Sequence, residues 1–110
     1  MSVIDSDPVV VIDQGEDGVV AITVPPLVSL VGVAAWELVT GPTRGGASTK
    51  TYGGTISTVD GVTTASWTVP RADTLVSTRQ WCVARVRYSG VSNTYRIFYR
   101  AEFLIRAGLT

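Results

Sequence analysis

The sequence of 110 residues contains no histidine and only one cysteine, Cys82. Without an imidazole, the chain lacks the usual activator of serine and cysteine nucleophiles, the commonest metal ligand and the usual general base near neutral pH. A single cysteine also excludes a disulfide within the chain. We therefore expect a protein that is not an enzyme, with no catalytic residue, no cofactor and no metal centre.

Charge is scarce as well, because only 16% of the residues are charged and nine basic residues balance nine acidic ones. A net charge of zero produces no field that would attract nucleic acid or an anionic membrane, so we expect neither as a partner. The hydrophobic share of 45% is that of a folded chain, and the length suits one domain with its own core.

No segment predicts a membrane span or a secretory signal. The longest uncharged run, residues 18–36, contains Pro25-Pro26 near its centre, and a proline pair breaks a helix. Two strands and a turn explain this run. The N-terminus has neither the basic start nor the long apolar stretch of a secretory signal, so we expect synthesis in the cytosol.

Short runs rich in β-branched residues recur between turn residues at the spacing of an all-β sandwich, whereas helix signals are missing. We predict a single domain of about seven antiparallel strands, preceded by a short N-terminal arm of about residues 1–8. The predicted strands are residues 8–13, 19–24, 33–40, 50–59, 62–69, 80–88 and 94–105.

Three connections refine this prediction. The pair Gly53-Gly54 predicts a bulge within the fourth strand, because glycine weakens a strand and permits a bend. Asp60-Gly61 is typical of a tight hairpin turn. Residues 71–78 are long enough to cross from one sheet to the other, as a Greek key requires.

The last two strands alternate clearly between two faces. In residues 80–88, Cys82 belongs to the inward set and Trp81 to the outward set. In residues 94–105 we assign the odd-numbered residues, from Tyr95 to Ile105, to the core and the even-numbered ones to the outer face. The predicted contact centre between the sheets consists of Trp36, Cys82, Val86, Ile97 and Phe103.

A four-residue hairpin loop at residues 90–93 would then determine which outward residues meet across the two strands. The expected pairs are Arg87 with Arg96, Arg85 with Phe98, Val83 with Arg100, and Trp81 with Glu102.

The order of charges along the chain is more informative than their sum. Residues 1–43 hold six acids and no base, whereas residues 71–110 hold seven arginines and two acids. A face kept for solubility usually carries lysine and glutamate, whereas arginine among large apolar side chains is typical of protein contact surfaces. A solvated polar face is the alternative interpretation.

We therefore predict an arginine-rich interaction surface on the last two strands, with the acidic N-terminal arm of a neighbouring subunit as its counterpart. The predicted interaction residues are Trp81, Arg85, Arg87, Arg96, Phe98, Arg100 and Arg106 on the sheet face, and Asp5 and Asp7 on the arm. The apolar loop of residues 27–31 is the alternative contact site.

Two further groups of residues favour structural roles. Cys82 is predicted to be a small buried hydrophobe, since free cysteine is among the most buried residue types. The loop of residues 13–18 offers three acids, but their spacing does not match an EF-hand calcium loop, so we interpret it as a solvated acidic turn.

The run from Asp13-Gln14-Gly15 through residues 19–24 and 27–32, together with residues 61–70 and the closing hairpin, resembles small immunoglobulin-like domains of tailed-bacteriophage virions. These include head-decoration proteins and upper-baseplate domains that adapt receptor-binding proteins. The resemblance implies an immunoglobulin-like Greek-key β-sandwich without a disulfide. It also implies a non-enzymatic structural subunit of the virion, made in the host cytoplasm, that binds other coat or tail subunits in a symmetric assembly or homo-oligomer.

Two alternatives to capsid decoration remain open at this point. The first is a tail or baseplate adaptor. The second is a carbohydrate-binding or adhesin module, for which the three tryptophans and four tyrosines would have to form an exposed stacking platform.

Overall fold

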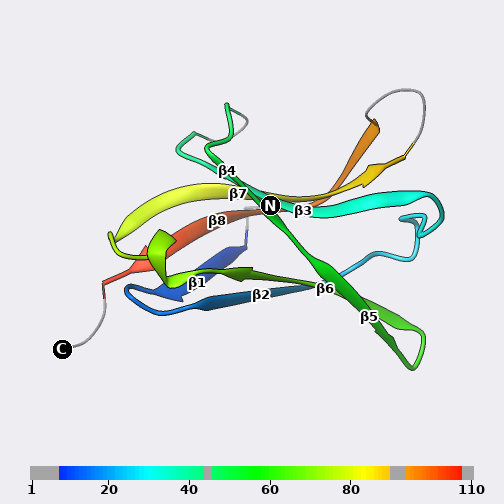
Figure 1. Ribbon diagram of the computed structural model, residues 1–110, viewed down its shortest axis with the longest axis horizontal. Helices are drawn as coiled ribbons and strands as arrows, with labels where there is room; N and C mark the ends of the chain where they lie inside the picture. The colour runs from blue at the N-terminus through cyan, green and yellow to red at the C-terminus, as the bar shows by residue number, and fades with distance from the viewer. Residues whose placement is uncertain (1–7, 44–45, 90–93, 108–110) are drawn as a thin grey trace, which may run out of the picture.

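The computed structural model describes residues 8–43, 46–89 and 94–107, and these ranges fold into an all-β structure (Figure 1). One short 3-10 helix, η1 (Arg71–Asp73), lies between two strands. Within the same ranges no helix is long and apolar enough to cross a membrane. The strands are β1 (Val9–Asp13), β2 (Gly18–Thr23), β3 (Val33–Gly41), β4 (Lys50–Gly53), β5 (Thr55–Val59), β6 (Val62–Val69), β7 (Thr78–Tyr88) and β8 (Thr94–Arg106).

Two sheets contain these eight strands. The five-stranded sheet has the order β1-β8-β7-β3-β4, and the three-stranded sheet has the order β2-β6-β5. The strand positions predicted from the sequence match closely, and the connection between β6 and β7 does cross from one sheet to the other. In the hairpin turn, Asp60 and Gly61 have φ angles of 51° and 77°, which is the type I′ geometry that Asp-Gly favours.

The predicted fourth strand is in fact two strands that belong to different sheets. β4 pairs with β3, β5 pairs with β6, and Gly54 is the residue where the chain changes sheet. A Cβ atom at Gly54 would overlap the indole of Trp67. The carbonyl of Trp36 accepts hydrogen bonds from the Gly54 N–H at 2.8 Å and from Trp67 Nε1 at 3.2 Å. The glycine therefore permits a sheet crossing over a tryptophan, and the expected bulge is wrong.

The N-terminal strand also departs from the prediction of antiparallel strands only. β1 pairs with β8 in parallel, with Val9 opposite Glu102 and Asp13 opposite Arg106. Because β1 covers only residues 102–106 of β8, the first half of β8 has no strand partner on that side among the described residues.

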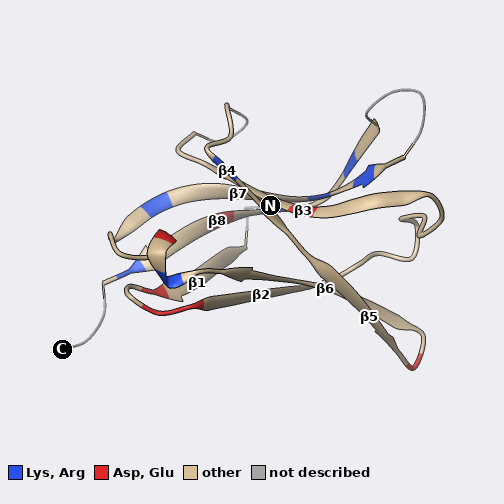
Figure 2. Cartoon of the chain, viewed as in Figure 1, with Lys and Arg blue, Asp and Glu red and all other residues tan. Residues whose placement is uncertain are grey.

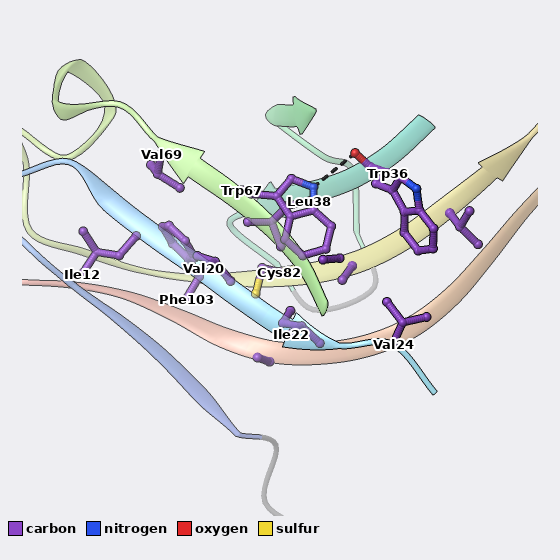
Figure 3. Close-up of a cluster of buried hydrophobic side chains, with 14 of the residues drawn as sticks. Ile12, Val20, Ile22, Val24, Trp36, Leu38, Trp67, Val69, Cys82 and Phe103 are labelled. Atoms are coloured by element: carbon purple, nitrogen blue, oxygen red, sulfur yellow. Dashed lines mark hydrogen bonds between the residues drawn. The ribbon is translucent and has the colours of Figure 1, made fainter. Parts of the chain in front are cut away.

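One apolar core lies between the two sheets (Figure 3). It includes four of the five residues predicted for the contact centre, namely Trp36, Cys82, Val86 and Phe103, each no more than 7% exposed. The fifth, Ile97, is 44% exposed, and its neighbour Tyr95 is 43% exposed. The assignment of these two residues to the core is wrong.

A bulge in β8 explains the error. Tyr99 pairs with Ala84, but Ile97 pairs with the next residue, Arg85, so Phe98 is an extra residue in β8. An extra residue reverses the facing of every side chain beyond it, because strand side chains alternate with a period of two. Residues 99–105 therefore keep the predicted facing, while residues 94–97 have the opposite one.

Candidate interaction surface

The outer face of the five-stranded sheet carries most of the predicted interaction residues. Trp81, Arg85 and Arg87 point outward from β7, because they alternate with the buried Cys82, Ala84 and Val86. Arg100 and Arg106 of β8 share this face, since they alternate with its buried residues Ala101, Phe103 and Ile105. Figure 2 shows basic residues in β4, β7 and β8, whereas β5 and β6 are free of charge along their length.

Two predicted residues do not belong to this outer face. Arg96 pairs with the buried Val86, which places it on the inner side of the sheet, at an exposed end. Phe98 packs inward, with its ring 5.9 Å from that of Trp36 in an edge-to-face contact and 6.5 Å from that of Trp67 in a stacked one. The expected pairs of Arg87 with Arg96 and Arg85 with Phe98 are therefore wrong.

The other two expected pairs, Val83 with Arg100 and Trp81 with Glu102, are confirmed. They lie on the side of the bulge that keeps the predicted register. Asp5 and Asp7 lie outside the described residues.

Acidic partners within the same sheet balance much of the arginine charge. Arg85 Nε lies 2.9 Å from one carboxylate oxygen of Glu37, and Arg87 Nε lies 3.6 Å from the other. Arg106 binds Asp13 at 2.7 Å, and Arg79 pairs with Glu102. These arginines are therefore not all available to a partner, which the sequence did not indicate.

The sequence did not point to Glu37 as a partner of these arginines. Its ion pairs depend on the pairing of β3 with β7, which places it opposite Arg85. These residues are 48 positions apart in the chain. Tyr95 is a second omission. The guanidinium carbon of Arg85 lies 4.1 Å from the centre of the Tyr95 ring, a cation–π contact that became possible when the bulge turned Tyr95 outward.

A hollow of about 360 Å³ lies on this face, between the β3–β4 connection and the strands β7 and β8. Its apolar wall is formed by Val39, Val83, Ile97 and Trp81, and its cationic groups are Arg85 and Arg100. Arg100 is exposed and forms no ion pair with any residue that the structure describes. Apolar walls beside an available guanidinium suit a group that combines an apolar stem with a carboxylate.

The thiol of Cys82 lies behind the hollow but offers no reactive group to it. Cys82 is 2% exposed, and burial raises its pKa to about 11. The thiol therefore stays protonated at neutral pH. It is a poor nucleophile, because the reactive form of cysteine is the thiolate. The prediction of a small buried hydrophobe is confirmed.

The acidic loop after β1 directs its carboxylates to separate partners. Asp13 binds Arg106, and Asp17 accepts a hydrogen bond of 2.6 Å from the backbone N–H of Arg71. In the parts of the chain that the structure describes, no three acidic or cysteine side chains gather in one place.

The alternative contact site predicted on the apolar loop is also exposed. Leu27 is 82% and Val31 is 84% exposed in the connection between β2 and β3. The loop also borders a hollow of its own, of about 490 Å³, so it is the charged side chains that distinguish the outer face of the five-stranded sheet from this loop.

No protein-family model matches the chain, and no curated protein matches it.

Proposed function

We propose that the chain is a non-enzymatic structural subunit of a bacteriophage virion, of the capsid-decoration or minor-head type. In this proposal it binds other coat subunits through the outer face of the five-stranded sheet. The observation that carries the proposal is the hollow on that face, where Arg100 is available beside the apolar side chains of Trp81, Val83 and Ile97. Arginine next to large apolar groups is the composition of contact surfaces.

The strand order supports an immunoglobulin-like sandwich as the fold class. In such domains one sheet contains strands B, E and D, and the other contains C, F and G, with an added C′ strand in variable-type domains. The order β2-β6-β5 corresponds to B-E-D, and β8-β7-β3-β4 corresponds to G-F-C-C′. The buried Trp36 of β3 and Cys82 of β7 then occupy the usual places of the core tryptophan and the second cysteine.

The charge of the face indicates an acidic partner surface. Its five arginines, at 79, 85, 87, 100 and 106, exceed its three acids, at 13, 37 and 102, so the described face has a positive excess. The acidic arm of a neighbouring copy, with Asp5 and Asp7, is the counterpart that the chain itself offers. The Pro8 carbonyl accepts a hydrogen bond from the Glu102 N–H, so Pro8, the residue after the acidic arm, lies beside β8 of this sheet.

A carbohydrate-binding module is less well supported. Trp36 and Trp67 are buried, so neither can stack on a sugar. The outward aromatics Trp81 and Tyr95 lie beside different ends of β7, because Tyr95 pairs with Arg87. Six residues of strand separate position 81 from position 87, or about 20 Å, which is too far for one continuous stacking platform.

The test compares two exposed arginines of the same strand. Arg100→Glu reverses a charge in the hollow, whereas the matched control Arg96→Glu reverses one on the other side of the sheet. Each purified variant is mixed with heads and, separately, with tails that lack the protein, and the bound fraction is measured by co-sedimentation. We expect Arg100→Glu to weaken binding by about tenfold or more and Arg96→Glu to leave it nearly unchanged.

The outcome also separates the alternatives. Binding to tails rather than heads would indicate the tail or baseplate adaptor. Equal binding of both variants and the wild type would refute the role of the arginine face and direct attention to the loop with Leu27 and Val31. Deletion of residues 1–7 should weaken association without unfolding the domain, if the acidic arm is the counterpart.

A further inference from the structure

The outer edge of the three-stranded sheet, strand β5, has none of the charges, prolines or bulges that usually block an open strand edge. All five of its residues, Thr55–Val59, are exposed. It contains no charged residue and no proline, and its pairing with β6 is regular throughout. Native proteins blunt such edges with charges, prolines or bulges, because unpaired backbone groups are a template for another strand.

The other open edges of the described chain are unsuitable for pairing with themselves. The free half of β8 carries Arg96 and Arg100 and contains the bulge, so two copies would bring arginines together. β4 begins at Lys50, which is engaged with Asp73. β2 lies beside β1 at the place where the two sheets approach each other (Figure 1). β5 is the edge that is at once uncharged, regular and exposed.

The hairpin turn determines which backbone groups of β5 are free. In a two-residue turn, the flanking residues Val59 and Val62 form a hydrogen-bonded pair, and such pairs alternate along the ladder. Ser57 therefore bonds to β6, while Ile56 and Thr58 direct their N–H and C=O groups to the open edge. The hydroxyls of Thr58 and Thr63 lie 2.9 Å apart, as expected of a non-hydrogen-bonded pair, in which side chains are closer.

We propose that β5 pairs with β5 of a second copy, antiparallel and centred on Ser57, to give one continuous six-stranded sheet. In this register Ile56 of each copy forms a hydrogen-bonded pair with Thr58 of the other, and Thr55 lies opposite Val59. These are neutral pairs of β-branched side chains, which pack well across strands. The interface is isologous, as a two-fold dimer requires.

Charge also favours a second copy of this chain as the occupant of the edge. The nearest charged residue, Asp60, would lie beyond the paired strand and opposite Gly54 of the other copy. No like charges therefore meet across the two-fold axis. Pairing would also cover Ile56, which is 40% exposed in the single chain. This inference does not depend on the function proposed for the arginine face.

The experiment uses the full chain without any other protein. Ser57→Cys places a thiol on the proposed axis, where non-hydrogen-bonded neighbours are close enough for a disulfide. Thr68→Cys is the matched control, because Thr68 is an exposed hydroxyl residue on the outer face of the central strand β6. The native Cys82 is buried and should not cross-link.

We expect the wild type to sediment as a dimer. After mild oxidation, a non-reducing gel should show Ser57→Cys largely as a disulfide-linked dimer and Thr68→Cys as a monomer. Thr58→Pro removes an outward N–H and should give a folded monomer. A wild type that is monomeric at every concentration would overturn the proposal. Cross-linking of Thr68→Cys as fast as that of Ser57→Cys would do so too. So would a folded Thr58→Pro dimer in a chain without residues 1–7, because the acidic arm offers copies a second contact. If Thr58→Pro fails to fold, the two cysteine variants decide.

Discussion

The outer faces of the two sheets differ sharply in chemistry, although both belong to one small sandwich. The five-stranded sheet presents arginines, acids and apolar side chains around a hollow. The three-stranded sheet presents only small uncharged side chains. Pairing and alternation place on its outer face Val19, Ala21 and Thr23 of β2, Val62, Thr64, Ser66 and Thr68 of β6, and Thr55, Ser57 and Val59 of β5.

This difference shows how one fold can offer two kinds of contact. A face with an excess of one charge repels its own copy and selects a partner of opposite charge. A neutral sheet has no such preference, so its edge can pair with an identical strand. The proposed contacts follow this division: an acidic surface for the arginine face, and an identical strand for the neutral edge.

The largest effect should come from the core that supports both faces. Phe103 is 2% exposed, and Phe103→Ala should lower the free energy of unfolding by about 3–5 kcal/mol, because a buried phenylalanine leaves a large cavity. Chemical denaturation measures the loss. A loss below about 1 kcal/mol would show that the end of β8 faces the other way.

The bulge can be tested by truncating two neighbouring side chains of β8, one at a time, and comparing the losses of stability. Phe98→Ala should cost about 2–3 kcal/mol, because the ring packs between Trp36 and Trp67 but is only half-buried. Ile97→Ala should cost less than about 1 kcal/mol, since Ile97 lies on the charged face and is 44% exposed. Urea unfolding measures both losses. A larger loss for Ile97→Ala than for Phe98→Ala would show that β8 alternates without a bulge and that Ile97 does not line the hollow.

A smaller effect should separate the charged face from the neutral one. Glu37→Gln leaves Arg85 and Arg87 without their shared carboxylate and should cost about 1 kcal/mol, less at high salt. Ser66→Ala, on the neutral face, should change stability by no more than about 0.5 kcal/mol at any salt concentration. Equal salt dependence in both variants would contradict the contrast between the faces.

The smallest effect concerns the pH dependence of stability. The hydrogen bond from Lys50 lowers the pKa of Asp73 below its ordinary value of 3.8, and Tyr52 donates a second bond at 3.0 Å. A lowered pKa stabilises the fold above the ordinary value, and this contribution is lost as the pH falls through the lowered pKa. The stability advantage of the wild type over Asp73→Asn should therefore shrink below pH 3.8.

The control for this measurement is Ser66→Ala on the neutral sheet, which changes no titratable group. Its difference in stability from the wild type should therefore stay constant across the same pH range. A constant difference for Asp73→Asn across the same acid range would refute the role of Lys50.

Sequence patterns predicted the site only in part. Trp81, Arg85, Arg87 and Arg100 were placed on the outer face, because alternation in β7 and in the second half of β8 is regular. Phe98 was misplaced because both possible facings of residues 94–98 put apolar side chains inward. Alternation therefore could not choose between Phe98 and the pair Tyr95 and Ile97. The aromatic contacts with Trp36 and Trp67, residues far away in the chain, decided it.

By itself the sequence determined most of the strands, the Asp60-Gly61 turn and the burial of Cys82, because these depend on neighbouring residues and on a local period of two. The tertiary structure decided the bulge at Phe98, the change of sheet at Gly54 and the sharing of Glu37 between two arginines. Each of these depends on which distant strand lies alongside. That choice is made by packing between residues far apart in the chain, which no local pattern records.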